Sequence, residues 1–75
     1  MKQPTFERMM EFCGYSPDDR KFEALRLVMV EGTTQYAAAR ATDYSVTQLN
    51  AVYSRVRREL ARVEKLIGGP LDGRA

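Results

Sequence analysis

Apolar residues recur at intervals of three or four along most of the chain, and glycine or short polar stretches separate the runs. This spacing is typical of amphipathic helices, in which one apolar face covers a core. No segment of strand length alternates apolar and polar residues. The pattern therefore predicts an all-α fold class with about four helices.

Two helices are expected in the N-terminal half of the chain. The first is expected over residues 5–13, with Thr5 as its N-cap and Gly14 at its end. The second is expected over residues 17–31, because Ser16 can act as its N-cap and a proline suits the first helical position. Each of these helices carries an apolar stripe that can face a core.

The C-terminal half predicts a short helix followed by a long one. The short helix is rich in alanine and is expected over residues 35–42, after a threonine cap. Ser45 is the expected N-cap of the long helix, whose apolar stripe continues to Ile67. Residues 68–75 are expected to form a flexible C-terminal tail, which leaves residues 1–67 as a single folded domain.

The part of the chain from the short helix into the long one matches the steric pattern of a helix-turn-helix. Ala39 is small where the two helices would meet, and Asp43 stands at the turn position that usually holds a left-handed glycine. Leu49 and Val52 are spaced to anchor the second helix. The expected fold is a small helical domain of about four helices containing a helix-turn-helix. Alanine-rich helical hairpins that bind no DNA share this pattern and remain the alternative.

The length and hydropathy of the chain predict one small protein without a membrane segment. Seventy-five residues allow a single domain, and no apolar run approaches the roughly 18 residues of a membrane span. The N-terminal residues lack the apolar core of a signal peptide. We therefore expect a cytoplasmic protein.

Few residue types suited to catalysis are present. The chain has no histidine, the most common general base and metal ligand, and Cys13 is its single cysteine. A single cysteine excludes an intrachain disulfide and a metal site built from several cysteines. We therefore expect no enzyme, no metal, no cofactor and no small-molecule substrate.

The charges are unevenly placed, although the net charge is only +2. Residues 1–32 hold five basic and six acidic side chains, whereas residues 33–67 hold six basic and three acidic ones. Four of the basic side chains are arginines that lie between Arg55 and Arg62. Such a basic run forms either a solvated helix face or a surface for polyanions such as nucleic acid phosphates.

The sequence around this motif resembles a known family. The stretch RLVMVEGTTQ, which spans residues 26–35, is followed by Ala39 and by the pair Arg55-Val56. This set is similar to the helix-turn-helix of the KorA/TrfB family, which are small plasmid-encoded transcriptional repressors. The resemblance covers about half of the chain without gaps. Asp43 departs from the turn glycine of the family, and the family's separate C-terminal dimerisation segment has no counterpart here.

The resemblance implies a transcriptional repressor of prokaryotic, phage or plasmid origin that binds a palindromic double-stranded DNA operator as a homodimer. In such proteins the second helix of the motif lies in the major groove. The candidate base contacts are Ser45, Val46, Thr47, Gln48, Asn50, Ala51 and Ser54. Asn50 suits adenine, whereas Val46 and Ala51 suit thymine methyl groups. The base-reading positions of the family fall at Val46 and Ala51, where longer polar side chains are usual, so we expect a different operator.

Phosphate contacts are expected from the start of the short helix and from nearby arginines. The candidates are Thr33, Thr34, Gln35, Arg40, Arg55, Arg57 and Arg58. Tyr36 and Tyr53 could also bind phosphate through their hydroxyls, but an aromatic side chain on such a helix is more often part of the core.

The apolar stripe of the long helix extends past the motif, and its last part is the expected homodimer interface. The candidate interface residues are Leu60, Val63, Leu66 and Ile67. A second candidate is the first helix, with Phe6, Met9 and Met10. In the alternative arrangement, the first helix folds back and covers the stripe within one monomer.

Two other functions remain open at this point. A small helical protein could use the same basic face to bind an acidic protein partner, and a helical domain of this kind could bind RNA. A repressor prefers one duplex sequence over a scrambled one, whereas an interaction module shows salt-sensitive binding without that preference.

Overall fold

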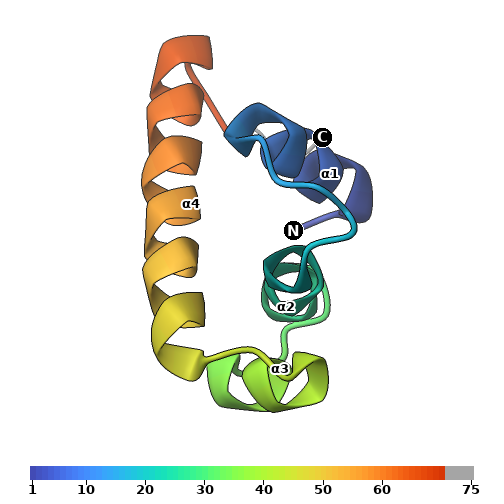
Figure 1. The fold of residues 1–75 in the computed structure, drawn as a ribbon. Coiled ribbons are helices and arrows are strands. Elements are labelled where there is room, and N and C mark those ends of the chain that lie inside the picture. The colour runs from blue at the N-terminus through green and yellow to red at the C-terminus, as the bar shows by residue number, and fades with distance from the viewer. Residues whose placement is uncertain (71–75) are drawn as a thin grey trace.

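Four helices make up most of residues 1–70, the part of the chain that the computed structural model describes (Figure 1). The helices are α1 (Gln3–Cys13), α2 (Arg20–Met29), α3 (Gln35–Thr42) and α4 (Val46–Ile67). No strand occurs among these residues, so the predicted all-α fold class is confirmed. None of these helices is long and apolar enough to cross a membrane. Residues 71–75 of the predicted tail lie outside the described part.

The long helix α4 is the element against which the other three pack. Its 22 residues extend about 33 Å along one side of the molecule, and α1, α2 and α3 follow one another beside it (Figure 1). α4 contacts each of the three, whereas α1 and α3 do not contact one another. α2 therefore separates α1 at one end of α4 from α3 at the other.

The apolar core draws residues from all four helices. Its buried members are Phe6, Met9, Met10, Ala24, Leu25, Ala38, Ala39, Leu49, Val56 and Leu60. Phe6 of α1 meets Phe22 of α2 edge to face, with ring centroids 5.1 Å apart. No buried side-chain polar atom within residues 1–70 lacks a hydrogen-bond partner. The core is thus an apolar cluster that joins the two halves of the chain.

The first helix begins before its predicted cap. α1 starts at Gln3, and Thr5 lies inside the helix, so the prediction of Thr5 as N-cap is wrong. Pro4 lies in the first turn, where a proline already has a helical φ and has no N–H that needs a partner. The helix can therefore begin upstream without a side-chain cap. Gly14 ends α1 as predicted, in the left-handed conformation with φ +79°.

The second helix is shorter than predicted at both ends: α2 spans Arg20–Met29, whereas the predicted range is residues 17–31. The hydroxyl of Ser16 accepts a hydrogen bond from the backbone N–H of Asp18 at 3.2 Å. The backbone N–H of Asp19 donates to the carbonyl of Ser16 at 3.0 Å. These bonds close a separate turn ahead of the helix, so the prediction of Ser16 as the N-cap of α2 is wrong.

The third and fourth helices match their predicted bounds and caps. The hydroxyl of Thr34 accepts from the backbone N–H of Ala37 at 3.2 Å, and the hydroxyl of Ser45 accepts from that of Gln48 at 3.3 Å. These bonds satisfy amides that the first turn of a helix leaves without a partner. Gly68 ends α4 in the left-handed conformation, with φ +81°.

The three-residue turn between α3 and α4 begins with Asp43. Asp43 has φ +54° and is the only non-glycine residue in residues 1–70 with a positive φ. The backbone N–H of Tyr44 donates to the carbonyl of Ala39 at 2.9 Å, which closes the end of α3. Ala38 and Ala39 are buried, and their small side chains let the neighbouring helices lie close to the α3 backbone.

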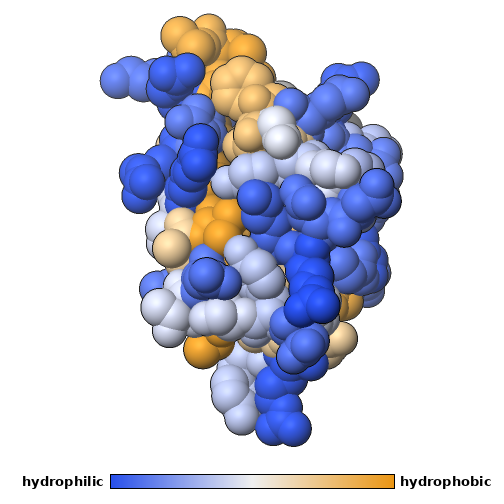
Figure 2. All heavy atoms as spheres, viewed as in Figure 1, coloured by the Kyte–Doolittle hydropathy of each residue, from blue (hydrophilic) through white to orange (hydrophobic). Residues whose placement is uncertain are grey.

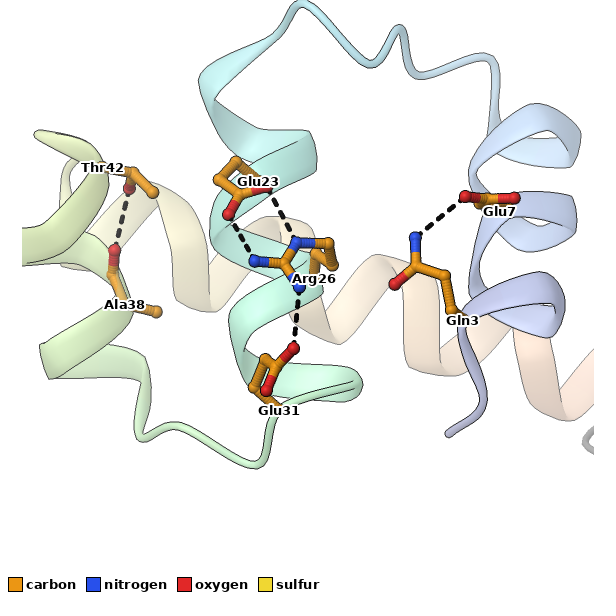
Figure 3. A network of polar contacts seen from close by, with 7 residues as sticks. All are labelled: Gln3, Glu7, Glu23, Arg26, Glu31, Ala38 and Thr42. Atoms are coloured by element: carbon orange, nitrogen blue, oxygen red, sulfur yellow. Dashed lines mark hydrogen bonds and ion pairs between the residues drawn. The ribbon is translucent and has the colours of Figure 1, made fainter.

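The connection between α2 and α3 is held by ion pairs around Arg26 (Figure 3). The guanidinium of Arg26 lies 2.7 Å from the carboxylate of Glu23 and 2.9 Å from that of Glu31. Hydrogen bonds from Arg26 hold the pKa of Glu23 below its ordinary value. Because Glu31 follows the end of α2, this network ties the start of the connection back to the helix.

Replacement of Asp43 by valine should destabilise the fold, whereas replacement by glycine should not. A β-branched side chain is strained in the left-handed conformation by about 1–2 kcal/mol, and glycine adopts that conformation freely. Urea unfolding followed by circular dichroism measures the change in the free energy of unfolding. Asp43→Asn is the matched control, because asparagine tolerates the same backbone conformation. Equal stability of the valine and glycine variants would contradict the left-handed turn.

Candidate functional site

The first half of α4 turns one face to the core and the other to solvent. Leu49 and Val56 are fully buried, and Val52 packs against the core, as predicted for residues that anchor this helix. The predicted base contacts Ser45, Val46, Thr47, Gln48, Asn50 and Ala51 are all exposed. Ser54 is half-buried. The candidate base contacts thus gather at the exposed start of α4.

Arginines without acidic partners surround this exposed face. The four arginines predicted to contact phosphates are exposed and form no ion pair among residues 1–70: Arg40, Arg55, Arg57 and Arg58. Arg62 lies one turn further along α4 and instead pairs with Glu59, with 3.7 Å between Nε and the carboxylate oxygen. α4 has no acidic side chain before Glu59. The positive charge of the first half of α4 is therefore not neutralised within that helix.

A hollow of about 490 Å³ lies between α3 and the start of α4, with Tyr36, Arg40 and Val46 in its lining. Nη1 of Arg40 donates to the hydroxyl of Tyr36 at 3.2 Å, and its guanidinium carbon lies 5.7 Å from the centre of the Tyr36 ring. Tyr36 is 61% exposed, so the interpretation of this tyrosine as a core residue is wrong. α3 turns Ala38 and Ala39 to the core, and Tyr36 is left in solvent. Tyr53 packs half-buried against the core, as predicted.

The start of α3 exposes fewer of its candidate phosphate contacts than α4 does. Thr34 is exposed, but its hydroxyl oxygen already accepts the capping hydrogen bond. Thr33 and Gln35 are half-buried. Of these three residues, only Thr34 is exposed.

Arg20 and Tyr44 also belong to this surface, although no sequence pattern predicts either of them. Nη1 of Arg20 donates to the carbonyl of Asp43 at 3.1 Å and lies 3.6 Å from its carboxylate. Tyr44 lines the hollow beside Arg40. Arg20 is 23 residues away from Asp43 in the chain, and only the packing of α2 on α3 brings the two together. Arg20 places a positive charge beside the one carboxylate of this hollow.

The apolar stripe of α4 is partly covered by α1. Leu60 is only 7% exposed and belongs to the core of the chain itself, so it is not available to a second copy. Val63 is half-buried and borders an apolar hollow of about 150 Å³ with Met9 and Phe12. Phe6, Met9 and Met10 of the alternative interface are all buried. The first helix therefore covers the stripe as far as Val63.

The last turn of α4 remains apolar and exposed. Leu66 is 78% exposed and Ile67 is 57% exposed, and Phe12 of α1 is exposed as well. Figure 2 shows apolar side chains gathered at the end of the molecule where α4 ends. No sequence pattern assigns Phe12 to this surface, because its exposure depends on how α1 rotates against α4.

The described residues hold little that could support metal or nucleophile chemistry. No group of three His, Cys, Asp or Glu side chains in residues 1–70 is placed to hold a metal ion. Cys13 is half-buried, and burial raises the pKa of its thiol. A thiol with a raised pKa is mostly protonated near neutral pH and is a poor nucleophile.

No family model matches the chain, and neither a curated protein nor a solved structure matches it. The exposed face of α4 and the arginines around it are thus the observations from which a function can be argued.

Proposed function

We propose that the chain is a transcriptional regulator that binds a specific sequence of double-stranded DNA, and that α3 and α4 form its helix-turn-helix. One observation carries this proposal. The exposed start of α4 is mostly polar, and four arginines without acidic partners in residues 1–70 lie further along α4 or on the neighbouring α3. In a helix-turn-helix, the second helix enters the major groove and neighbouring basic side chains contact phosphates. The resemblance to the KorA/TrfB repressors supports the same function, with a palindromic operator as the partner.

The exposed side chains of α4 divide between polar and apolar base contacts. Asn50 can form two hydrogen bonds with adenine, and the hydroxyl of Thr47 can reach a neighbouring base. Val46 and Ala51 offer only apolar contact, which suits a thymine methyl group. A face of this composition favours a site rich in A·T pairs.

We propose a homodimer that forms through the last turn of α4. Leu66 and Ile67 are exposed at the end of α4, far from its start beside the turn at Asp43 (Figure 1). An interface there leaves the face proposed to bind DNA free in both copies. Two copies on a palindrome hold two half-sites at once, which raises the affinity well above that of one copy.

Selection of binding sites from random duplexes tests the proposed function. We expect an enriched palindromic sequence that the protein binds about 10³-fold or more tightly than a scrambled duplex at the same salt concentration. Salt-sensitive binding with no enriched sequence would contradict sequence-specific regulation. It would favour a module that uses its basic face to bind an acidic protein.

Arg58→Ala should weaken the binding of every duplex alike. Arg58 is exposed and has no acidic partner in residues 1–70, so loss of its phosphate contact should lower the slope of log K against log salt by about 0.9. Fluorescence anisotropy at several salt concentrations measures this slope. Arg62→Ala is the matched control, because it removes the same charge from an arginine that already pairs with Glu59. A slope that changes equally in both variants would remove Arg58 from the phosphate contacts.

Asn50→Ala should reduce sequence preference without affecting non-specific binding. Loss of a two-bond contact to a base costs about 1–3 kcal/mol of discrimination, and the side chain is exposed, so the fold should remain stable. Affinities for the selected site and for a scrambled duplex separate the two effects. An equal loss on both duplexes would show that Asn50 contacts the backbone.

Leu66→Glu should dissociate the homodimer without unfolding the monomer, because Leu66 is 78% exposed. Sedimentation should then show a folded monomer, and affinity for the palindrome should fall by about 100-fold. Ala61→Glu is the matched control, since Ala61 is also exposed on α4 but lies outside the apolar end. A variant that remains dimeric would place the interface elsewhere.

A further inference from the structure

A second hollow borders the exposed face of α4. It has a volume of about 260 Å³ and is lined by Tyr15, Lys21, Tyr44, Ala51, Val52 and Arg55. Val46 of α4 lines the first hollow, whereas Arg55 of the same helix lines the second. The two residues are nine positions apart, which is about two and a half turns of helix, so they point to opposite sides. The two hollows therefore lie on opposite flanks of α4, and the predicted base contacts Thr47 and Asn50 lie on the exposed face between them.

Two cations in this second hollow have no acidic partner. Lys21 is half-buried, and its Nζ lies 4.6 Å from the centre of the Tyr15 ring. Neither Lys21 nor Arg55 forms an ion pair with any residue in the described range 1–70. Two cations that line one hollow are unfavourable without a counter-charge, because they repel one another.

The position of Lys21 at the start of α2 adds to this excess of positive charge. α2 begins at Arg20, so Lys21 lies in its first turn, where the helix dipole favours negative charge and disfavours cations. An anion in the hollow would face Lys21 and Arg55 together, and Lys21 belongs to the first turn of α2. The composition of the hollow thus fits an anionic ligand.

Two tyrosine hydroxyls complete the lining with neutral hydrogen-bond donors. Burial raises the pKa of Tyr15, and the nearby Arg55 opposes this rise. The phenol of Tyr15 is protonated near neutral pH and can donate a hydrogen bond to an anionic oxygen. Tyr44 lines both hollows and so stands between the two flanks of α4.

We propose that the hollow of Tyr15, Lys21, Tyr44 and Arg55 binds a backbone phosphate of duplex DNA, on the strand opposite the one that Arg40 faces. This inference rests on the proposed function. A helix in the major groove lies between two phosphate backbones, because the groove is only about 12 Å wide. A phosphate site on each flank of α4 would hold the helix between the two strands and set its depth in the groove.

Lys21→Gln tests the second phosphate site. The variant should bind every duplex about eightfold more weakly at 0.1 M salt, and its slope of log K against log salt should fall by about 0.9. Lys2→Gln is the matched control, since it removes the same charge from an exposed lysine that precedes α1 and lies outside the second hollow. Lys21→Arg should retain the slope of the wild type, because it keeps the charge. Circular dichroism of each variant confirms that it is folded.

The outcomes separate this site from the proposed function. Equal slopes for Lys21→Gln and Lys2→Gln, with steep salt dependence in the wild type, would overturn the site and leave DNA binding intact. A folded Lys21→Arg variant that loses as much affinity as Lys21→Gln would also overturn it, because a phosphate contact accepts either cation. A wild-type chain that binds no duplex at all would overturn both the site and the proposed function.

Discussion

The left-handed turn at Asp43 determines how the candidate base contacts of α4 lie relative to α3. α4 is held by this turn at one end and by buried Leu49 and Val56 along its length. Each residue of a helix adds about 100° of rotation, so a shift of one position would bring Asn50 to the core and Leu49 to solvent. The turn, the small side chain of Ala39 and the two buried anchors therefore fix which face of α4 is free.

Acidic residues within one helical turn account for four arginines of this chain, but not for Arg40 or Arg55, which have Asp43 and Glu59 within a turn and form no ion pair among residues 1–70. Arg26 has Glu23 three positions before it, and Arg62 has Glu59, and both form ion pairs. Arg57 and Arg58 have no acidic residue three or four positions away on either side. Their charge is left to solvent or to a polyanion, and this part of the site can be derived from spacing alone.

The sequence predicted the C-terminal half better than the N-terminal half, for a physical reason. The caps Thr34 and Ser45 bind amides three residues ahead, so short-range chemistry decides where α3 and α4 begin. The hydroxyl of Ser16 can either cap a helix or close a turn, and in this structure it closes a turn. The spacing of residues in the sequence does not distinguish these two outcomes. Hollows that join Lys21 to Arg55, or Arg20 to Asp43, depend on tertiary packing and leave no local pattern.

One uninterrupted helix, α4, carries both the proposed DNA contacts and the proposed dimer interface. α4 carries the candidate base contacts at its start, core residues in its middle and exposed Leu66 and Ile67 at its end. Since a packed helix transmits orientation along its length, a contact between two copies at the last turn constrains the angle between their first turns. A second copy at the last turn would thus restrict which half-site spacing both copies can bind, so that dimer geometry adds to sequence preference.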